Sequence, residues 1–311
     1  MKKAAYPIIY SIWYAISLLP LWVLYRISDL LFLLVYYVIR YRRKIVRANM
    51  VSSFPEKQMR DIVSIEKKYY KWFCDYVVET IKMLTMSRRE MKKRMRFENL
   101  DLMNNPLSEG RNVSIFLGHY CNWEWIASLG MHFVSNVYPC QLYHPLENQV
   151  FDKLFLYMRG RFDSHSLPMD SAFNILLEKK RECVPTVTGY ISDQVPGFSS
   201  MHYWPNFLNH KTPTFTGAER ISRILDTTVV YMDVVRVRRG YYVGKVVKIC
   251  DKPSEMPKFS ITEKYYQLLE TTINRNPEYW LWSHNRWKRT WEDFCKVYPS
   301  ETERDRILSK L

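Results

Sequence analysis

The sequence has few cysteines, and they form no pattern that would mark a disulfide framework or a structural metal site. No two of the six are spaced as C-x-x-C, and none lies in a cluster of metal-ligating residue types. The lack of such a cluster argues against a structural zinc site. We therefore expect reduced thiols in a protein that faces the cytosol, with no metal or organic cofactor. The six residues are Cys74, Cys121, Cys140, Cys183, Cys250 and Cys295.

The sequence also lacks internal repeats, low-complexity tracts and a glycine- or serine-rich linker. Its 311 residues suffice for one large domain or two small ones. Because no linker divides the chain, we expect one domain over residues 46–311 behind an N-terminal membrane anchor over residues 1–45.

Charged residues are absent between Lys3 and Arg26. As a helix, this stretch would be about 33 Å long, close to the thickness of a bilayer core. A cleavable signal peptide would have a shorter apolar region and a small-residue cleavage site, whereas here a second apolar run follows at residues 30–39. We expect the segment to bind the membrane by spanning it, by forming a hairpin or by lying in its plane. A buried amphipathic helix pair in a soluble protein is the alternative.

A cluster of basic residues follows the apolar runs and outnumbers the two lysines at the N-terminus. By the positive-inside rule, this excess places the rest of the chain in the cytoplasm, and the same side chains are expected to contact anionic headgroups. The net charge of +15 favours anionic partners, which include nucleic acid, anionic lipid and a phosphorylated substrate. The apolar segment argues against nucleic acid. The basic residues are Arg40, Arg42, Arg43, Lys44 and Arg47.

From residue 111 onward, short β-branched runs alternate with helical patterns. This alternation predicts an α/β fold with a mixed sheet flanked by helices. Strands are expected at residues 113–117, 138–143 and 184–192, and a hairpin at 227–249. Helices are expected at residues 56–95, 123–133, 148–161, 171–180, 213–225, 261–274 and 278–288, the last of which is rich in tryptophan.

A histidine follows the first of these strands, and a glutamate comes five residues later, in Gly118-His119-Tyr120-Cys121-Asn122-Trp123-Glu124. In one continuous helix the two side chains would lie about 140° apart and would not touch. With Asn122 as N-cap, however, Glu124 falls in the first turn and His119 on the preceding loop. His119 would then donate a ring N–H to Glu124 and take a proton from a hydroxyl with its other nitrogen. A capping histidine beside an unrelated surface glutamate is the alternative.

Polar residues also follow the strand expected at 184–192. Asp193 and Gln194 lie at its carboxyl end, where α/β proteins form their sites. Arg159 and Arg161 close the helix expected at 148–161 and are candidates to bind phosphate or an oxyanion. A turn-forming aspartate and arginines that complement a helix C-terminus are the structural alternatives.

Five segments resemble, in the right order, the late (lauroyl/myristoyl-type) acyltransferases of lipid A biosynthesis, which belong to the lysophospholipid-acyltransferase-like superfamily. The segment at 118–124 matches the H-x4-D/E motif of that family in its glutamate form. Together the segments cover almost the whole chain. They are residues 41–50 with 53–56, 118–124, 193–194, 212–220 and 279–288.

The resemblance implies a glycerolipid-acyltransferase-like fold and a single-step O-acyl transfer at the cytoplasmic face of the inner membrane. The donor would be an acyl-carrier-protein thioester or acyl-CoA, and the acceptor a hydroxyl on a fatty chain of the phosphorylated glucosamine disaccharide. His119 would be the general base and Glu124 its partner. Arg159 or Arg161 would stabilise the thioester oxyanion. Further contacts to the oxyanion or the substrate would come from Asn122, Asp193 and Gln194.

Residues 120–121, 123–125 and 198–205 depart from the family pattern, and this departure leaves the acceptor open. Another hydroxylated lipid, such as an aminolipid or a lysophospholipid, would suit the same base. A membrane lipid-binding protein without chemistry is the alternative from another class. It would explain the apolar segment and the charge, but not the polar residues at two strand ends.

Overall fold

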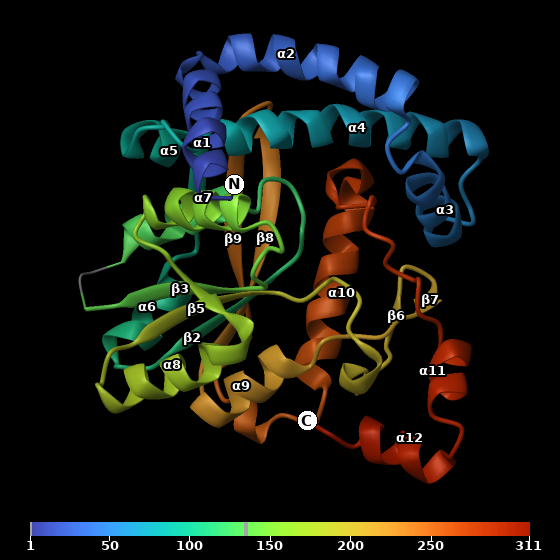
Figure 1. Ribbon diagram of the computed structural model, residues 1–311. Helices are drawn as coiled ribbons and strands as arrows, with labels where there is room; N and C mark the ends of the chain where they lie inside the picture. The colour runs from blue at the N-terminus through green and yellow to red at the C-terminus, as the bar shows by residue number, and fades with distance from the viewer. Residues whose placement is uncertain (1, 134–135) are drawn as a thin grey trace.

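The computed structural model describes residues 2–133 and 136–311, with a seven-stranded sheet at its centre (Figure 1). The strand order is β1-β9-β8-β2-β5-β3-β4. β8 and β9 pair antiparallel and the other neighbours pair parallel, so the expected α/β class with a mixed sheet is confirmed. The strands of this sheet are β1 (Met95–Glu98), β2 (Val113–Leu117), β3 (Tyr138–Tyr143), β4 (His165–Pro168), β5 (Thr186–Ile191), β8 (Thr228–Arg238) and β9 (Tyr241–Cys250).

Helices surround this sheet, and a separate two-stranded ribbon pairs β6 (Asn206–Phe207) with β7 (His210–Lys211). The α-helices are α1 (Lys2–Leu18), α2 (Leu21–Leu33), α3 (Arg43–Ser53), α4 (Met59–Lys82), α5 (Arg88–Arg94), α6 (Asp101–Ser108), α7 (Gln149–Gly160), α8 (Met169–Arg181), α9 (Gly217–Leu225), α10 (Ser260–Arg275), α11 (Trp291–Val297) and α12 (Glu301–Leu308). The π- and 3₁₀-segments are η1 (Leu34–Ile39), η2 (Trp125–His132), η3 (Phe198–Ser200), η4 (Pro253–Glu255) and η5 (Pro277–Tyr279).

The two faces of the sheet are buried by different helices, because successive side chains of a strand point to opposite faces. On one face, the Ser222 hydroxyl of α9 donates to the Ser114 hydroxyl of β2 at 2.9 Å, and the Tyr265 ring of α10 packs on Phe116. The other face carries Ile115 of β2 and lies toward η2, which contacts β1 and β3.

A glycine in η2 allows the segment after α7 to approach closely. A Cβ built on Gly130 would lie 2.5 Å from the carbonyl oxygen of Asp163 and 2.6 Å from that of Phe162. Since both neighbours are backbone atoms, no larger residue fits here without moving one of the two segments.

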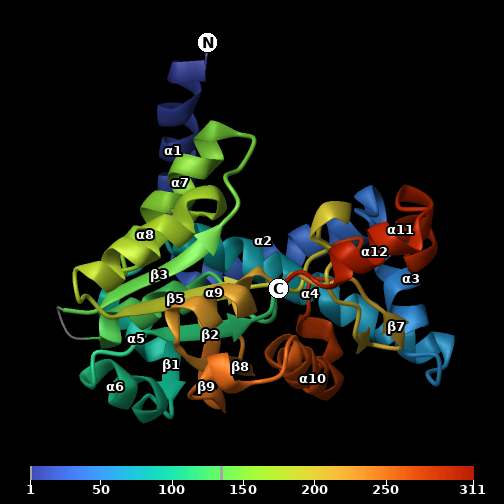
Figure 2. The ribbon, with the colours of Figure 1, turned by 90° about the horizontal axis from the view of Figure 1, so that it is seen from below.

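The N-terminal helix α2 lies beside α4 (Figure 1). Helix α1 contacts α4 and α7, and its N-terminal end extends beyond α7 (Figure 2). The buried residues of α2 recur at three- and four-residue spacing and include Leu21, Leu24 and Phe32. Its opposite side is apolar yet exposed, with Trp22 69% and Leu30 67% exposed. The helix over Leu21–Ile39 is long and apolar enough to cross a membrane. The membrane anchor over residues 1–45 stays a prediction.

Several expected elements coincide with observed ones, and others are shifted. The strands at 113–117 and 138–143 match β2 and β3. The helix at 123–133 is the 3₁₀ segment η2, and the helix at 213–225 begins only at Gly217.

The tryptophan-rich segment at 278–288 is not the expected helix, because its backbone pairs with the loop after β2. The Cys121 N–H donates to the Tyr279 carbonyl at 2.8 Å, and the Leu281 N–H donates to the His119 carbonyl at 3.1 Å. These long-range bonds satisfy backbone groups that a helix would otherwise pair, so tertiary context overrides the local pattern.

Candidate active site

His119 lies just past the end of β2 and is held by Asp193, just past the end of the neighbouring strand β5. The imidazole Nδ1 lies 2.6 Å from Asp193 Oδ1, and the His119 main-chain N–H donates to Asp193 Oδ2 at 2.8 Å. A Cβ on the preceding Gly118 would lie 2.6 Å from Leu269 Cδ1 and 3.3 Å from Asp193 Oδ2, so a larger residue here would displace the Leu269 side chain. Two parallel strands that end side by side therefore bring the expected histidine and aspartate into direct contact.

The hydrogen bond expected between His119 and Glu124 does not form, so this prediction is wrong. Glu124 instead pairs with Arg159 of α7, which donates from Nε and Nη2 to the two carboxylate oxygens, each at 2.8 Å. The left-handed backbone of Cys121 (φ 53°) turns the chain between the two motif residues. The partner of His119 therefore comes from the adjacent strand rather than from its own motif.

Asp193 is buried and ionised. Burial alone would raise its pKa, but the His119 imidazole and hydrogen bonds from His119 and Trp280 lower the pKa to about 2. The Trp280 indole N–H donates to Asp193 Oδ2 at 2.8 Å. The sequence analysis missed this role of Trp280, because no local signal links a tryptophan to an aspartate 87 residues away.

The second imidazole nitrogen of His119 faces Gln194, whose Nε2 lies 3.4 Å from His119 Nε2. The Trp123 ring packs edge-on against the imidazole, with ring centroids 5.1 Å apart. Since Nδ1 is bonded to an ionised carboxylate, it carries the ring proton, and Nε2 is the nitrogen that can accept one.

The site opens into a large apolar cavity of about 970 Å³. His119, Glu124, Arg159 and Gln194 all line it, so the two motif residues share one environment although they do not touch. The apolar lining comes from strands, from η2 and from α7, and includes Ile115, Leu117, Ile126, Leu129, Phe155, Val187 and Ile191. A cavity of this kind suits a ligand with a long apolar part.

Two of the expected substrate-binding residues point away from the cavity. Asn122 is fully buried: it accepts from the Trp125 N–H at 3.1 Å and donates to Glu79. The expected N-cap position is wrong, because η2 begins at Trp125 and its N-cap residue is Glu124. Arg161 donates to the carbonyls of Met83 and Met86, beyond the end of α4. Arg159 and Arg161 diverge because residues two apart near a helix end point about 200° apart.

The basic cluster after the apolar helices is partly used inside the protein. Arg43 and Arg47 both pair with the buried Glu66, at 3.4 Å and 2.7 Å. Arg42 donates to the Ser283 carbonyl at 3.0 Å and Arg40 to the Tyr37 carbonyl at 3.3 Å, while both side chains stay exposed, as does Lys44. Contact of the three exposed residues with anionic headgroups stays a prediction.

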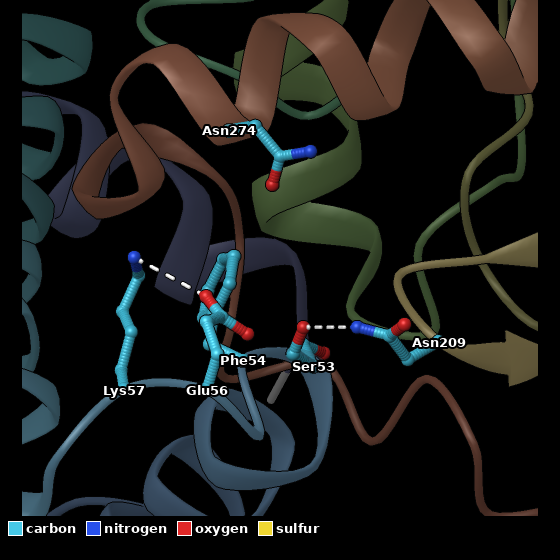
Figure 3. A pocket seen from close by; sticks show the side chains of 6 residues that line it. All are labelled: Ser53, Phe54, Glu56, Lys57, Asn209 and Asn274. Carbon is cyan, nitrogen blue, oxygen red and sulfur yellow. Dashed lines mark hydrogen bonds and ion pairs between the residues drawn. The ribbon is translucent and has the colours of Figure 1, made fainter.

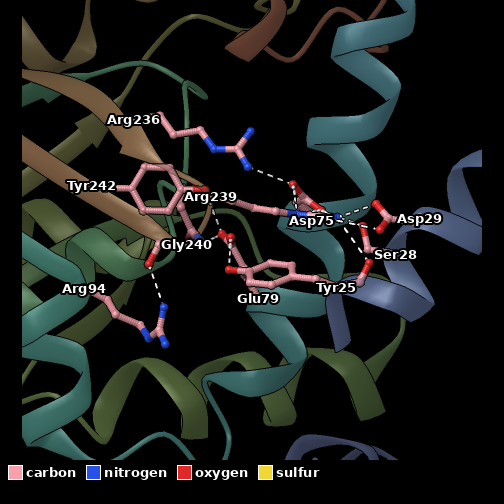
Figure 4. Close-up of polar contacts among 11 residues, drawn as sticks. Tyr25, Ser28, Asp29, Asp75, Glu79, Arg94, Arg236, Arg239, Gly240 and Tyr242 are labelled. Atoms are coloured by element: carbon pink, nitrogen blue, oxygen red, sulfur yellow. Dashed lines mark hydrogen bonds and ion pairs between the residues drawn. The ribbon is translucent and has the colours of Figure 1, made fainter. Parts of the chain in front are cut away.

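A buried polar network behind the site joins α2, α4 and β9 (Figure 4). The Glu79 carboxylate accepts from the Tyr25 hydroxyl at 2.9 Å, the Tyr242 hydroxyl at 2.8 Å and the Asn122 amide at 2.7 Å. Since Asn122 also accepts from the Trp125 N–H at the start of η2, the network holds the segment that carries Glu124. One turn earlier on α4, Asp75 accepts from Ser28, Arg236 and Arg239 (Figure 4).

A second, smaller pocket of about 320 Å³ lies near the end of α3 (Figure 3). The Asn209 amide donates to the Ser53 carbonyl at 3.0 Å, and Lys57 pairs with Glu56 at 3.3 Å. The lining of this pocket holds no histidine–carboxylate pair. Its six lining residues are Ser53, Phe54, Glu56, Lys57, Asn209 and Asn274.

In the described part of the chain, no three His, Cys, Asp or Glu side chains lie close enough together to hold a metal ion.

An aspartate that orients a histidine beside an apolar cavity is an arrangement suited to general-base chemistry on a ligand with a long apolar part. The chain belongs to the bacterial lipid A biosynthesis acyltransferase family, whose model matches residues 3–289. It is similar to the lipid A biosynthesis palmitoleoyltransferase of Escherichia coli (strain K12) and to the lipid A biosynthesis acyltransferase of Shigella flexneri. Each is 23% identical over 299 residues, which cover 92% of this chain and 94% of the relative. The family expected from the sequence motifs is thereby confirmed, and the protein is an acyltransferase.

Proposed function

We propose that this enzyme moves a fatty acyl group from an acyl thioester to a hydroxyl of a membrane lipid, and that this lipid is a lipid A precursor. The observation that carries the proposal is the orientation of His119. Its Nδ1 is held 2.6 Å from an ionised Asp193, while its ring lines an apolar cavity. The donor is acyl-carrier protein or acyl-CoA, and the names of the relatives support the acceptor class.

In the proposed reaction, His119 Nε2 removes the proton of the acceptor hydroxyl. The oxygen attacks the thioester carbonyl carbon, and the resulting tetrahedral intermediate expels the thiolate as the carbon–sulfur bond breaks. The proton held on His119 then passes to the sulfur. Asp193 keeps the imidazole in the required tautomer and stabilises the imidazolium between the two proton transfers.

Two cavity-lining side chains are suited to the negative charge of the intermediate. The Arg159 guanidinium is fixed by two hydrogen bonds to Glu124, so it is oriented before substrate binds. The Gln194 amide lies next to His119 Nε2. In this account Glu124 acts through Arg159 and is a positioning residue.

We also propose that the enzyme lies at the inner membrane with its catalytic domain in the cytoplasm. The exposed apolar side of α2 and η1 supports membrane contact, with Trp22, Leu30 and Val38 each more than two-thirds exposed. The exposed basic residues Arg40 and Lys44 lie at the end of that surface, where anionic headgroups would bind them. Replacing Trp22 and Leu30 together by glutamate should release the protein from anionic vesicles in a flotation assay. Unchanged flotation would contradict this placement.

The transfer itself is tested with detergent-purified enzyme, an acyl thioester and a lipid A precursor. We expect thiol release that depends on the acceptor, and a lipid whose mass rises by one acyl group. Thiol release without any acylated lipid would contradict the proposal. Transfer to a lysophospholipid or an aminolipid in place of the lipid A precursor would redirect the acceptor assignment.

A further inference from the structure

One face of the central sheet forms a wall of the apolar cavity over several residues. In register across the strands, Leu117 lies opposite Ile191, and Ile115 lies opposite Gly189. One further step from the carboxyl edge, Val187 lies opposite Pro139. All six of these residues line the cavity. At about 3.3 Å per residue, the wall runs for about 13 Å from Ile191 to Val187, away from the edge where His119 lies.

Gly189 lies at the middle of this wall. It belongs to β5, which has neighbours on both sides in the sheet, yet it is partly exposed because the cavity lies above it. The other positions of β5 on this face carry the branched side chains Val187 and Ile191. The missing side chain therefore leaves a depression in the path that an acyl chain would follow from His119.

The backbone does not require glycine here. Gly189 has no left-handed φ, and a Cβ at this position would meet Gln141 Cβ at 3.6 Å, the Cys140 carbonyl at 3.7 Å and Leu117 Cδ2 at 3.9 Å. These are ordinary contact distances, so a small side chain fits without displacing the sheet. Glycine weakens the interior of a strand, so the stability of the fold gives no reason for glycine at this position. The cavity does give a reason, because the absent side chain leaves space for a ligand.

The neighbouring side chain does not fill the depression. Gln141 lies opposite Gly189 on β3, donates to the Ser166 hydroxyl at 2.7 Å and accepts from the Ser164 hydroxyl. Both hydrogen bonds draw its amide toward β4, away from Gly189.

We propose that Gly189 determines which acyl chain lengths the enzyme transfers, because the space above it holds the middle of the donor chain. This inference rests on the proposed acyl transfer from a thioester. A side chain at position 189 would stop longer chains from seating their carbonyl at His119, while shorter chains would still fit. Gly189 is then a specificity-determining residue that takes no part in the chemistry.

The test is the dependence of kcat/KM on donor length for the full-length enzyme and for Gly189→Ala and Gly189→Val, with acyl-carrier-protein thioesters from octanoyl to palmitoyl. We expect Gly189→Val to shift the preferred donor to a shorter chain, with about 10-fold or greater loss for the longest donor relative to the shortest. Gly189→Ala should shift the preferred donor length less than Gly189→Val. If the valine variant does not fold, the alanine variant still provides the test.

The matched control is Gly160→Ala on α7. A Cβ at this position meets no atom within 4 Å, and Gly160 does not line the cavity. It should keep the wild-type length profile. An equal loss with every donor, or an unshifted profile in both Gly189 variants, would overturn the inference while the wild-type enzyme still transfers. Failure of the wild-type enzyme to transfer from any thioester would instead overturn the proposed function.

Discussion

The carboxylate of Asp193 binds His119 twice, through the imidazole Nδ1 at 2.6 Å and through the main-chain N–H at 2.8 Å. The contact with Nδ1 sets the tautomer of the imidazole, and the contact with the main-chain N–H fixes the position of the His119 backbone. The residue that orients the proposed base thus lies 74 positions further along the chain, and the glutamate of the histidine motif has another partner.

Asp193→Asn should lower kcat by about 10²- to 10⁴-fold, because an amide does not stabilise the imidazolium and can favour the wrong tautomer. The measurement is the steady-state rate of acceptor-dependent thiol release. Asp251→Asn on the surface is the matched control and should keep the wild-type rate. An Asp193→Asn enzyme with unchanged kcat would refute the orienting role.

Glu124→Gln should lower activity less than Asp193→Asn, since Glu124 acts through Arg159. Breaking this largely buried ion pair by replacing either partner should cost about 3–5 kcal/mol of unfolding free energy. A double-mutant cycle with Arg159→Gln should therefore show coupling in stability. Additive effects of the two substitutions would contradict the pairing.

Trp280→Phe removes one of the hydrogen bonds that hold the pKa of Asp193 down, so the pKa of this carboxyl should rise. A hydrogen bond to a charged group is worth about 1.5–3 kcal/mol. The acidic limb of the rate–pH profile should move to higher pH, and Trp291→Phe should leave it in place. An unmoved limb in Trp280→Phe would show that the indole does not act on Asp193.

His284 predicts a pH dependence of stability. Its Nε2 accepts from the Val195 N–H at 3.2 Å, and burial lowers its pKa from 6.5 to about 4. Between these values the unfolded chain binds more protons than the folded one, so stability falls as the pH drops from 6.5 toward 4, by at most about 3 kcal/mol. Above pH 6.5 this contribution is fully present.

The measurement is the thermal unfolding midpoint of the detergent-purified protein across this pH window. His284→Gln removes the titrating group and should flatten the curve, whereas the same substitution at the exposed His144 should leave its shape unchanged. An equally steep curve for His284→Gln would exclude His284 as a source of the acid sensitivity.

Much of the local structure could be predicted from the sequence. The strands at 113–117 and 138–143 were bounded correctly because they are short apolar or β-branched runs between loop residues. The sequence also predicts His119 and Asp193 as site residues, because each follows an expected strand. What these patterns do not contain is the order of the strands in the sheet.

That missing order explains the wrong partner for His119. β2 and β5 are neighbours in the sheet, but the 68 residues 118–185 separate the end of β2 at Leu117 from the start of β5 at Thr186. Only the folded structure therefore shows that His119 and Asp193 meet. The same limit applies to Trp280, whose segment matches a helical spacing. It is held extended by backbone bonds to the loop around Cys121, which no local pattern encodes.

The most direct test of this account is the single-turnover rate of acyl transfer by His119→Ala, measured with saturating thioester donor and lipid acceptor. The account predicts that transfer falls at least about 10²-fold while the thermal unfolding midpoint stays close to that of the wild type. Transfer at the wild-type rate by the folded variant would contradict the assignment of His119 as the base.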